Sequence, residues 1–168
     1  MGGGIAQEIA LRHPERVASL VLACTAARGE PEGKAPRIPW ILRIIPPRWV
    51  IELRSTRSYG ADVPKEVMAA DQAILKASRR TSRGLIGQAE ATMAYRSKDR
   101  VGQITVPTLV IHGDQDKTVP IERGRELAAL IPGARLEVIE GAGHNFITSV
   151  DCPANHLVKE FWKGLPAP

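Results

Sequence analysis

The chain has 168 residues, of which 43% are hydrophobic, and a formal net charge of +5, which suits one globular domain. No apolar run reaches the roughly 18 residues of a membrane span, and the glycine-rich start lacks the regions of a signal peptide, so we expect a cytoplasmic protein without membrane contact. The basic residues gather in residues 26–100 but accompany no nucleic-acid-binding motif, which argues against a nucleic-acid partner.

The first expected elements are a helix and a buried strand. Apolar residues at helical spacing predict a helix over Ile5–His13, and Pro14 ends it. The nearly continuous apolar run Val17–Ala23 is typical of a strand that is buried on both faces of a parallel sheet. We expect Cys24, which follows this strand, to pack as a small apolar residue.

The part of the chain from Thr25 to Arg100 differs in character from what precedes and follows it. Six prolines divide it into short pieces, and apolar spacing fits helices around Val67–Leu75 and Leu85–Met93. The pattern predicts a helical insertion between two strands. We therefore divide the chain into a core of residues 1–25 and 101–168 and a helical cap of residues 26–100.

Strands and helices alternate again after Pro107. The pattern predicts strands over Thr108–His112 and Leu136–Ile139, with a helix over Ile121–Leu130 between them. A last helix is expected between residues 150 and 162, with an inner side made of Leu157, Val158, Phe161 and Trp162. The chain is thus predicted to be α/β, with three parallel strands and flanking helices. The first strand would keep an unpaired apolar edge, so we expect self-association through residues 17–23.

Two short motifs follow the last two expected strands. His112-Gly113-Asp114-Gln115-Asp116 comes after one strand, and Gly141-Ala142-Gly143-His144 comes after the other. Ligands of open α/β sheets bind at the carboxyl ends of strands, where both motifs would lie. A hydroxyl nucleophile needs a base, and the base needs an acid that orients it. His144 is the candidate base and Asp116 the candidate acid.

Other interpretations of these polar residues stay open. Asp114 competes with Asp116 for the role of the acid, although it could instead cap the following turn. His112, at a strand end, is expected to support the turn that carries Asp116. The histidines and the two cysteines have no metal-ligand spacing, so we expect no metal and no cofactor.

With these motifs in place, the chain resembles the α/β-hydrolase superfamily. Met1-Gly2-Gly3-Gly4 looks like the tail of the nucleophile elbow, G-x-S-x-G, and the segment from Arg12 to Val17 is similar to the passage from the following helix to its strand. Gly113-Asp114-Gln115-Asp116 matches the acid turn, and Gly143-His144 matches the histidine loop. The acid precedes the histidine, as it does in the family.

The resemblance implies a partial α/β-hydrolase fold with a helical cap, acting on an ester, lactone or related acyl bond of a small-molecule substrate. The nucleophile would fall one position before Met1, whose backbone nitrogen would stand in for an oxyanion-hole donor, so we expect the chain alone to be inactive. Apolar cap residues would line the substrate pocket or simply pack the cap against the core: Trp40, Ile41, Trp49 and Met93.

Two alternatives to a serine hydrolase remain at this point. An aspartate in the nucleophile position would suit an epoxide hydrolase or a dehalogenase, which share the fold. Outside the enzymes, the chain could be a non-catalytic protein that pairs its open strand edge with a partner.

Overall fold

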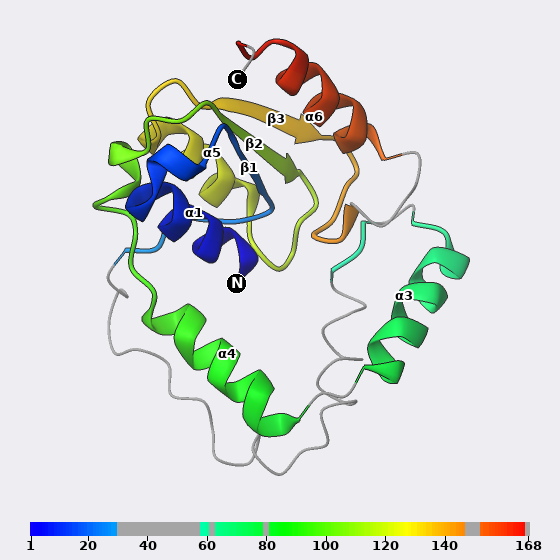
Figure 1. The fold of residues 1–168 in the computed structure, drawn as a ribbon. Helices are drawn as coiled ribbons and strands as arrows, with labels where there is room; N and C mark the ends of the chain where they lie inside the picture. The colour runs from blue at the N-terminus through cyan, green and yellow to red at the C-terminus, as the bar shows by residue number, and fades with distance from the viewer. Residues whose placement is uncertain (30–57, 61–62, 79–80, 147–151, 167–168) are drawn as a thin grey trace.

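The computed structural model describes residues 1–29, 58–60, 63–78, 81–146 and 152–166. Within them a three-stranded parallel sheet has the order β1-β2-β3, formed by Leu20–Ala23, Thr108–Gly113 and Arg135–Ile139 (Figure 1). Since β2 lies in the centre, all six of its residues are buried. The predicted α/β fold class with parallel strands is confirmed.

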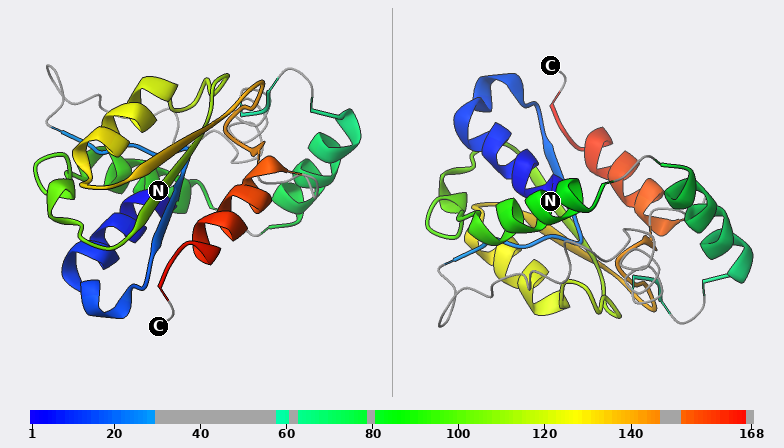
Figure 2. Two further views of the ribbon diagram at one scale, coloured as in Figure 1. Left: turned by 90° about the horizontal axis from the view of Figure 1, so that it is seen from above. Right: turned by 90° about the horizontal axis from the view of Figure 1, so that it is seen from below.

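Helices cover the sheet on both faces, which gives three layers (Figure 2). Helices α1 (Gly2–Arg12) and α5 (Ile121–Leu130) share one apolar cluster with the sheet, while α6 (Pro153–Lys163) packs on the opposite face. The first cluster includes Ala10, Leu20, Leu22, Val110 and Leu127. The second includes Leu109, Ile111, Ile139, Phe146 and Ala154. Burial of these alternating strand residues on both faces holds the layers together.

Two predicted boundaries at the start of the chain differ from the structure. Helix α1 begins at Gly2, earlier than expected, because three glycines hide the helical period from the sequence. Strand β1 begins at Leu20 and not at Val17, whose N–H instead donates to Pro14 O (3.1 Å) and closes the 3₁₀ turn η1 (Pro14–Arg16).

The last helix confirms the expected apolar side with one exception. Leu157, Val158 and Phe161 pack against the second cluster, but Trp162 is 55% exposed, so its predicted place on the inner side is wrong. A helix turns by about 100° per residue. The next position after Phe161 is therefore rotated away from the sheet.

Two helices lie within the insertion, where the sequence predicts them. They are α3 (Lys65–Ala77) and α4 (Ser82–Ala94), and they stand apart from the three-layered core (Figure 1). Neither helix has a fully buried residue. The short 3₁₀ turn η3 (Val101–Gln103) then leads back to β2. In the described ranges, no helix has the length and the hydropathy to cross a membrane.

Candidate active site

The ends of β2 and β3 bring the two sequence motifs together. The strands are parallel, and Gly113 of β2 is paired with Ile139 of β3, so both polypeptide segments leave the sheet at one edge. Asp114 N then donates to Ile139 O (3.2 Å), and Gln115 N donates to Ala142 O (2.9 Å). These bonds tie the turn that carries Asp116 to the loop that carries His144.

Asp116 and His144 form the hydrogen bond that the sequence leads us to expect. His144 Nδ1 lies 2.7 Å from Asp116 Oδ2, and the aspartate side chain is fully buried. The other carboxylate oxygen, Oδ1, accepts hydrogen bonds from Thr118 N (2.7 Å) and Val119 N (2.8 Å). Asp114 is exposed, so of the two acids on this turn Asp116 is the one that is bonded to the histidine.

The surroundings of Asp116 favour its charged form. Burial opposes ionisation, but the hydrogen bonds from Val119 N, His144 and Thr118 N outweigh it and lower the pKa of the Asp116 carboxyl below its ordinary value of 3.8. An ionised carboxylate can only accept hydrogen bonds, so His144 Nδ1 carries a hydrogen. The lone pair of the imidazole is then on Nε2, and the side chain is 29% exposed. The pair can therefore take up a proton from a group that approaches from outside.

His112 supports the acid turn, as the sequence suggests. Its ring is completely buried, and Nε2 lies 2.9 Å from Val119 O and 3.5 Å from Asp116 Oδ2. A carbonyl oxygen can only accept, so Nε2 carries the hydrogen. Helix α5 comes close to the ring, because a Cβ added at Gly124 would lie 2.3 Å from His112 Nδ1. The imidazole thus fills the space between α5 and the turn.

Cys24 lies beside the acid–base pair at the end of β1. It is buried in the second apolar cluster, as expected, and its Sγ is 3.8 Å from Gly143 O. Its backbone φ is +45°, which is unusual for a residue with a side chain. Burial raises the pKa of the thiol to about 12, so the group is neutral at ordinary pH. Cys24, Asp116 and His144 offer metal-ligand atoms within 4.8 Å of one another.

Residues 58–60 touch the histidine loop, a contact that no pattern in the sequence indicates. Asn145 N donates to Ser58 O (2.7 Å), and the two backbones approach so closely that a Cβ added at Gly143 would lie 2.4 Å from Gly60 N. Tyr59 is buried, and its hydroxyl donates to Asp71 Oδ2 of α3 (2.8 Å). Part of the insertion therefore supports the loop of His144. The only hint in the sequence is that Gly60 and Gly143 are glycines, and their separation along the chain does not reveal that they meet.

The structure describes only some of the remaining residues that the sequence predicts for the site. Met1 is the N-cap of α1, and its carbonyl accepts hydrogen bonds from Gly4 N (2.9 Å) and Ile5 N (3.3 Å). Met93 is half-buried near the end of α4, and its carbonyl accepts from Arg96 Nη1 (2.6 Å). Trp40, Ile41 and Trp49 lie outside the described residues.

Comparison with known proteins gives consistent results. Residues 1–151 match the family described as serine aminopeptidase, S33. A poly(3-hydroxyalkanoate) depolymerase of Ectopseudomonas oleovorans is 34% identical over 163 residues, which are 94% of this chain and 57% of that protein. A 2-hydroxymuconate semialdehyde hydrolase of Pseudomonas sp. (strain CF600) is 32% identical over 157 residues, which cover 85% of this chain and 52% of the relative.

A solved structure agrees with these relatives. The enol-lactonase from Burkholderia xenovorans LB400 is 28% identical and superposes with a TM-score of 0.78, over 97% of this chain and 63% of that one. The chain thus spans less than two thirds of the length of each of these three proteins. Because the family match extends over most of its residues, the chain belongs to the serine aminopeptidase, S33 family within the α/β-hydrolase superfamily.

Proposed function

We propose that His144 and Asp116 are the base and the acid of a Ser-His-Asp hydrolase that cleaves an ester, lactone or related acyl bond. The observation that carries the proposal is the 2.7 Å contact between His144 Nδ1 and the buried Asp116 carboxylate. The depolymerase and the enol-lactonase named above support this class of substrate. The proposed nucleophile is a serine of the elbow that the family places directly before helix α1.

The reaction follows from the positions of these groups. His144 Nε2 takes the proton of the serine hydroxyl as the oxygen attacks the acyl carbon, and it later gives a proton to the leaving group. Asp116 stabilises the imidazolium that forms in between, because its charge lies next to Nδ1. When a serine is joined to Met1 by a peptide bond, the backbone N–H of Met1 donates a hydrogen bond to the developing oxyanion. We also propose that Met93, which is half-buried, contributes to the acyl pocket.

The proposal is tested with the chain alone and with the chain joined to the N-terminal part of a family member that ends in a G-x-S elbow. We call the joined form the complemented protein. The chain alone is expected to show no hydrolysis of p-nitrophenyl butyrate or of a lactone above buffer, since loss of a nucleophile costs about 10⁶ in kcat. The complemented protein is expected to hydrolyse these substrates.

The control is the complemented protein with alanine in place of the elbow serine, which should be inactive. Hydrolysis by the chain alone that disappears in His144→Ala would contradict the proposed position of the nucleophile. Turnover of epoxides or haloalkanes, but not of esters, by a complemented protein with an elbow aspartate would favour the related enzyme class instead.

We also propose that the chain by itself associates with a second copy through β1. Within the described residues β1 has a strand neighbour on one side only. Leu20 N and Cys24 N donate to Pro107 O and Ile111 O (both 2.9 Å), so the alternating N–H groups of Val21 and Ala23 point outward. Next to this edge, α1 exposes an apolar stripe at a spacing of four residues: Met1, Ile5 and Ile9. An apolar strand with free N–H groups recruits another strand.

The substitution Val21→Pro is expected to weaken this association while leaving the sheet intact. Proline removes one outward N–H from each copy, and two lost bonds of about 1 kcal/mol each raise the dimer Kd at least about tenfold. Sedimentation measures the Kd, and circular dichroism checks the fold. Leu22→Pro is the matched control, because its N–H points toward β2 and its loss should unfold β1. A wild-type chain that stays monomeric at tens of micromolar would refute the proposal.

A further inference from the structure

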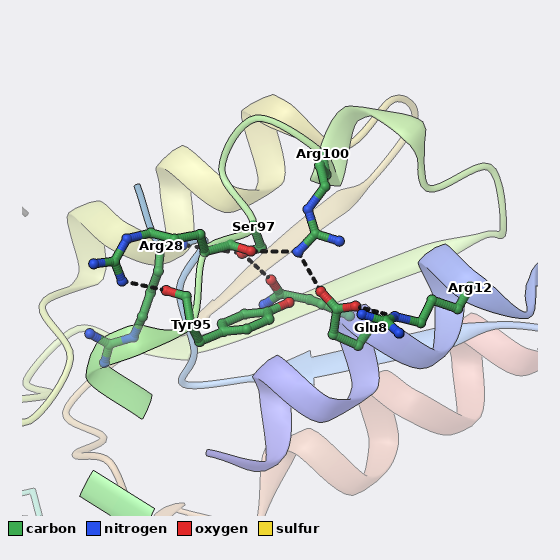
Figure 3. A network of polar contacts seen from close by, with 8 residues as sticks. Glu8, Arg12, Arg28, Tyr95, Ser97 and Arg100 are labelled. Atoms are coloured by element: carbon green, nitrogen blue, oxygen red, sulfur yellow. Dashed lines mark hydrogen bonds and ion pairs between the residues drawn. The ribbon is translucent and has the colours of Figure 1, made fainter. Parts of the chain in front are cut away.

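Helix α1 contacts both segments that connect the insertion to the core. The exit linker (residues 25–29) leaves the end of β1, and the return linker (residues 95–100) follows α4. Figure 3 shows side chains of α1 and of the two linkers gathered in one polar network. The mechanism proposed above does not use this network.

The first turn of α1 is shaped for close contact with both linkers. A Cβ added at Gly3 would lie 2.2 Å from Thr25 Oγ1 at the start of the exit linker. A Cβ added at Gly4 would lie 3.1 Å from the ring of Tyr95 at the start of the return linker. Side chains at these two helix positions would push the linkers away, so the glycines let them lie directly on the helix.

One turn further on, Gln7 joins the two linkers with a single side chain. It is completely buried, and its Nε2 donates to Ala26 O of the exit linker (3.2 Å). Its Oε1 accepts from Ser97 Oγ of the return linker (2.8 Å), and Ser97 is also completely buried. Both ends of the amide are therefore occupied by different linkers.

The linkers are also bonded to each other around this point. Ser97 N and Lys98 N both donate to Arg28 O (2.7 and 3.0 Å), and Arg28 N donates to Ser97 Oγ (3.2 Å). Gln7 thus closes a small buried network. A buried amide without partners is unfavourable, so this network holds only while both linkers stay in place.

A second, more exposed group of hydrogen bonds also connects α1 to the return linker. Glu8 accepts hydrogen bonds from Arg100 Nη2 (2.5 Å) and from Arg12 Nε (2.7 Å), and Arg100 also donates to Arg96 O. These hydrogen bonds, that of Arg100 above all, lower the pKa of Glu8 to about 2. Solvent screens this partly exposed pair, so the buried amide of Gln7 is the more specific link.

We propose that Gln7 is a positioning residue that fixes the insertion relative to the helix of the nucleophile. Helices α3 and α4 bury no residue fully, so packing of these helices holds the insertion only weakly. Gln7 sets where the chain leaves and rejoins the core, and α4 ends directly at the return linker. Given the proposed function, α1 also begins at the nucleophile. Contacts that the insertion makes with the substrate would therefore keep a fixed position relative to the helix that follows the nucleophile.

The test is hydrogen exchange of the backbone amides in the chain, which needs no enzymatic activity. Gln7→Met keeps the length of the side chain but removes both polar atoms. The amides of Arg28, Ser97 and Lys98 are expected to exchange at least about tenfold faster, while those of β2 and α5 keep their wild-type rates. Thr108→Val is the matched control: Thr108 is also buried, and its Oγ1 donates to Val106 O (2.9 Å), away from the linkers.

Ser97→Ala provides a second variant that removes the partner of Gln7 on the return linker. It should give the same local acceleration, and the double variant should add little to either single one. Equal acceleration across the core, or unchanged linker amides in both variants, would overturn the proposal. In the complemented protein, Gln7→Met should also change the preference between acetate and longer acyl esters, whereas Thr108→Val should not. Failure of all hydrolysis would count against the proposed function and leave the exchange result valid.

Discussion

Replacing Asp116 by asparagine is expected to lower kcat of the complemented protein by about four orders of magnitude with little loss of stability. The backbone bonds of this side chain decide the outcome. Asparagine keeps its oxygen on Thr118 N and Val119 N, which both donate, so its amide nitrogen takes the place of Oδ2. That nitrogen faces His144 Nδ1 and also donates.

The consequence is a change of tautomer in His144. Its Nδ1 must then accept, so the hydrogen moves to Nε2, and the imidazole can no longer take the proton of the serine. The variant is checked by kcat for p-nitrophenyl butyrate and by thermal unfolding. Asp114→Asn, on the exposed part of the same turn, is the control and should retain activity to within about twofold. An Asp116→Asn variant with more than about a tenth of wild-type kcat would show that the acid is elsewhere.

Replacing Gly113 by alanine is expected to damage both stability and activity. A Cβ at this position would lie 2.3 Å from Ala142 O and 2.7 Å from Gly143 O, which are backbone atoms of the histidine loop. The loop must move away from the acid turn to make room. We expect a loss of about 1–3 kcal/mol in the free energy of unfolding, and a fall of about 100-fold in kcat/KM because His144 is displaced from Asp116.

Urea unfolding and the kinetics of the complemented protein measure these effects. Gly87→Ala is the control, because a Cβ there meets nothing within 4 Å and the residue lies inside α4. It should leave kcat/KM unchanged and stabilise the helix by up to about 1 kcal/mol. Wild-type stability and activity in Gly113→Ala would mean that the two loops do not depend on their close approach.

The core of the fold could be predicted because its patterns are local. Strand β2 is an unbroken apolar run, and α5 has clear apolar spacing before a proline and a glycine, so both were found where the structure has them. The hydrogen bond between Asp116 and His144 could be expected for the same reason, since each residue lies shortly after a recognisable strand. The start of α1 could not be predicted because its glycines add no apolar residues to the helical pattern. Gly3 and Gly4 instead allow close contacts with Thr25 and Tyr95, which spacing in the sequence does not reveal.

Contacts between distant segments account for what the sequence did not show. The apolar spacing of the first helix does not single out Gln7, yet this side chain is buried because residues 19 and 90 positions away supply its partners. Likewise, Ser58 and Gly60 meet the histidine loop more than 80 residues later in the chain. Such pairs depend on the tertiary arrangement of backbones, which composition and periodicity do not encode.

The backbone contact between residues 58–60 and the histidine loop limits how this protein can be engineered. A Cβ added at Gly60 would lie 2.1 Å from Gly141 O, so neither side of the contact tolerates a larger residue without movement. A cap taken from a relative to change substrate range would therefore have to bring a matching glycine, or keep residues 58–60 of this chain. The insertion contacts the loop of His144 directly, so we do not expect it to be exchangeable as an independent module.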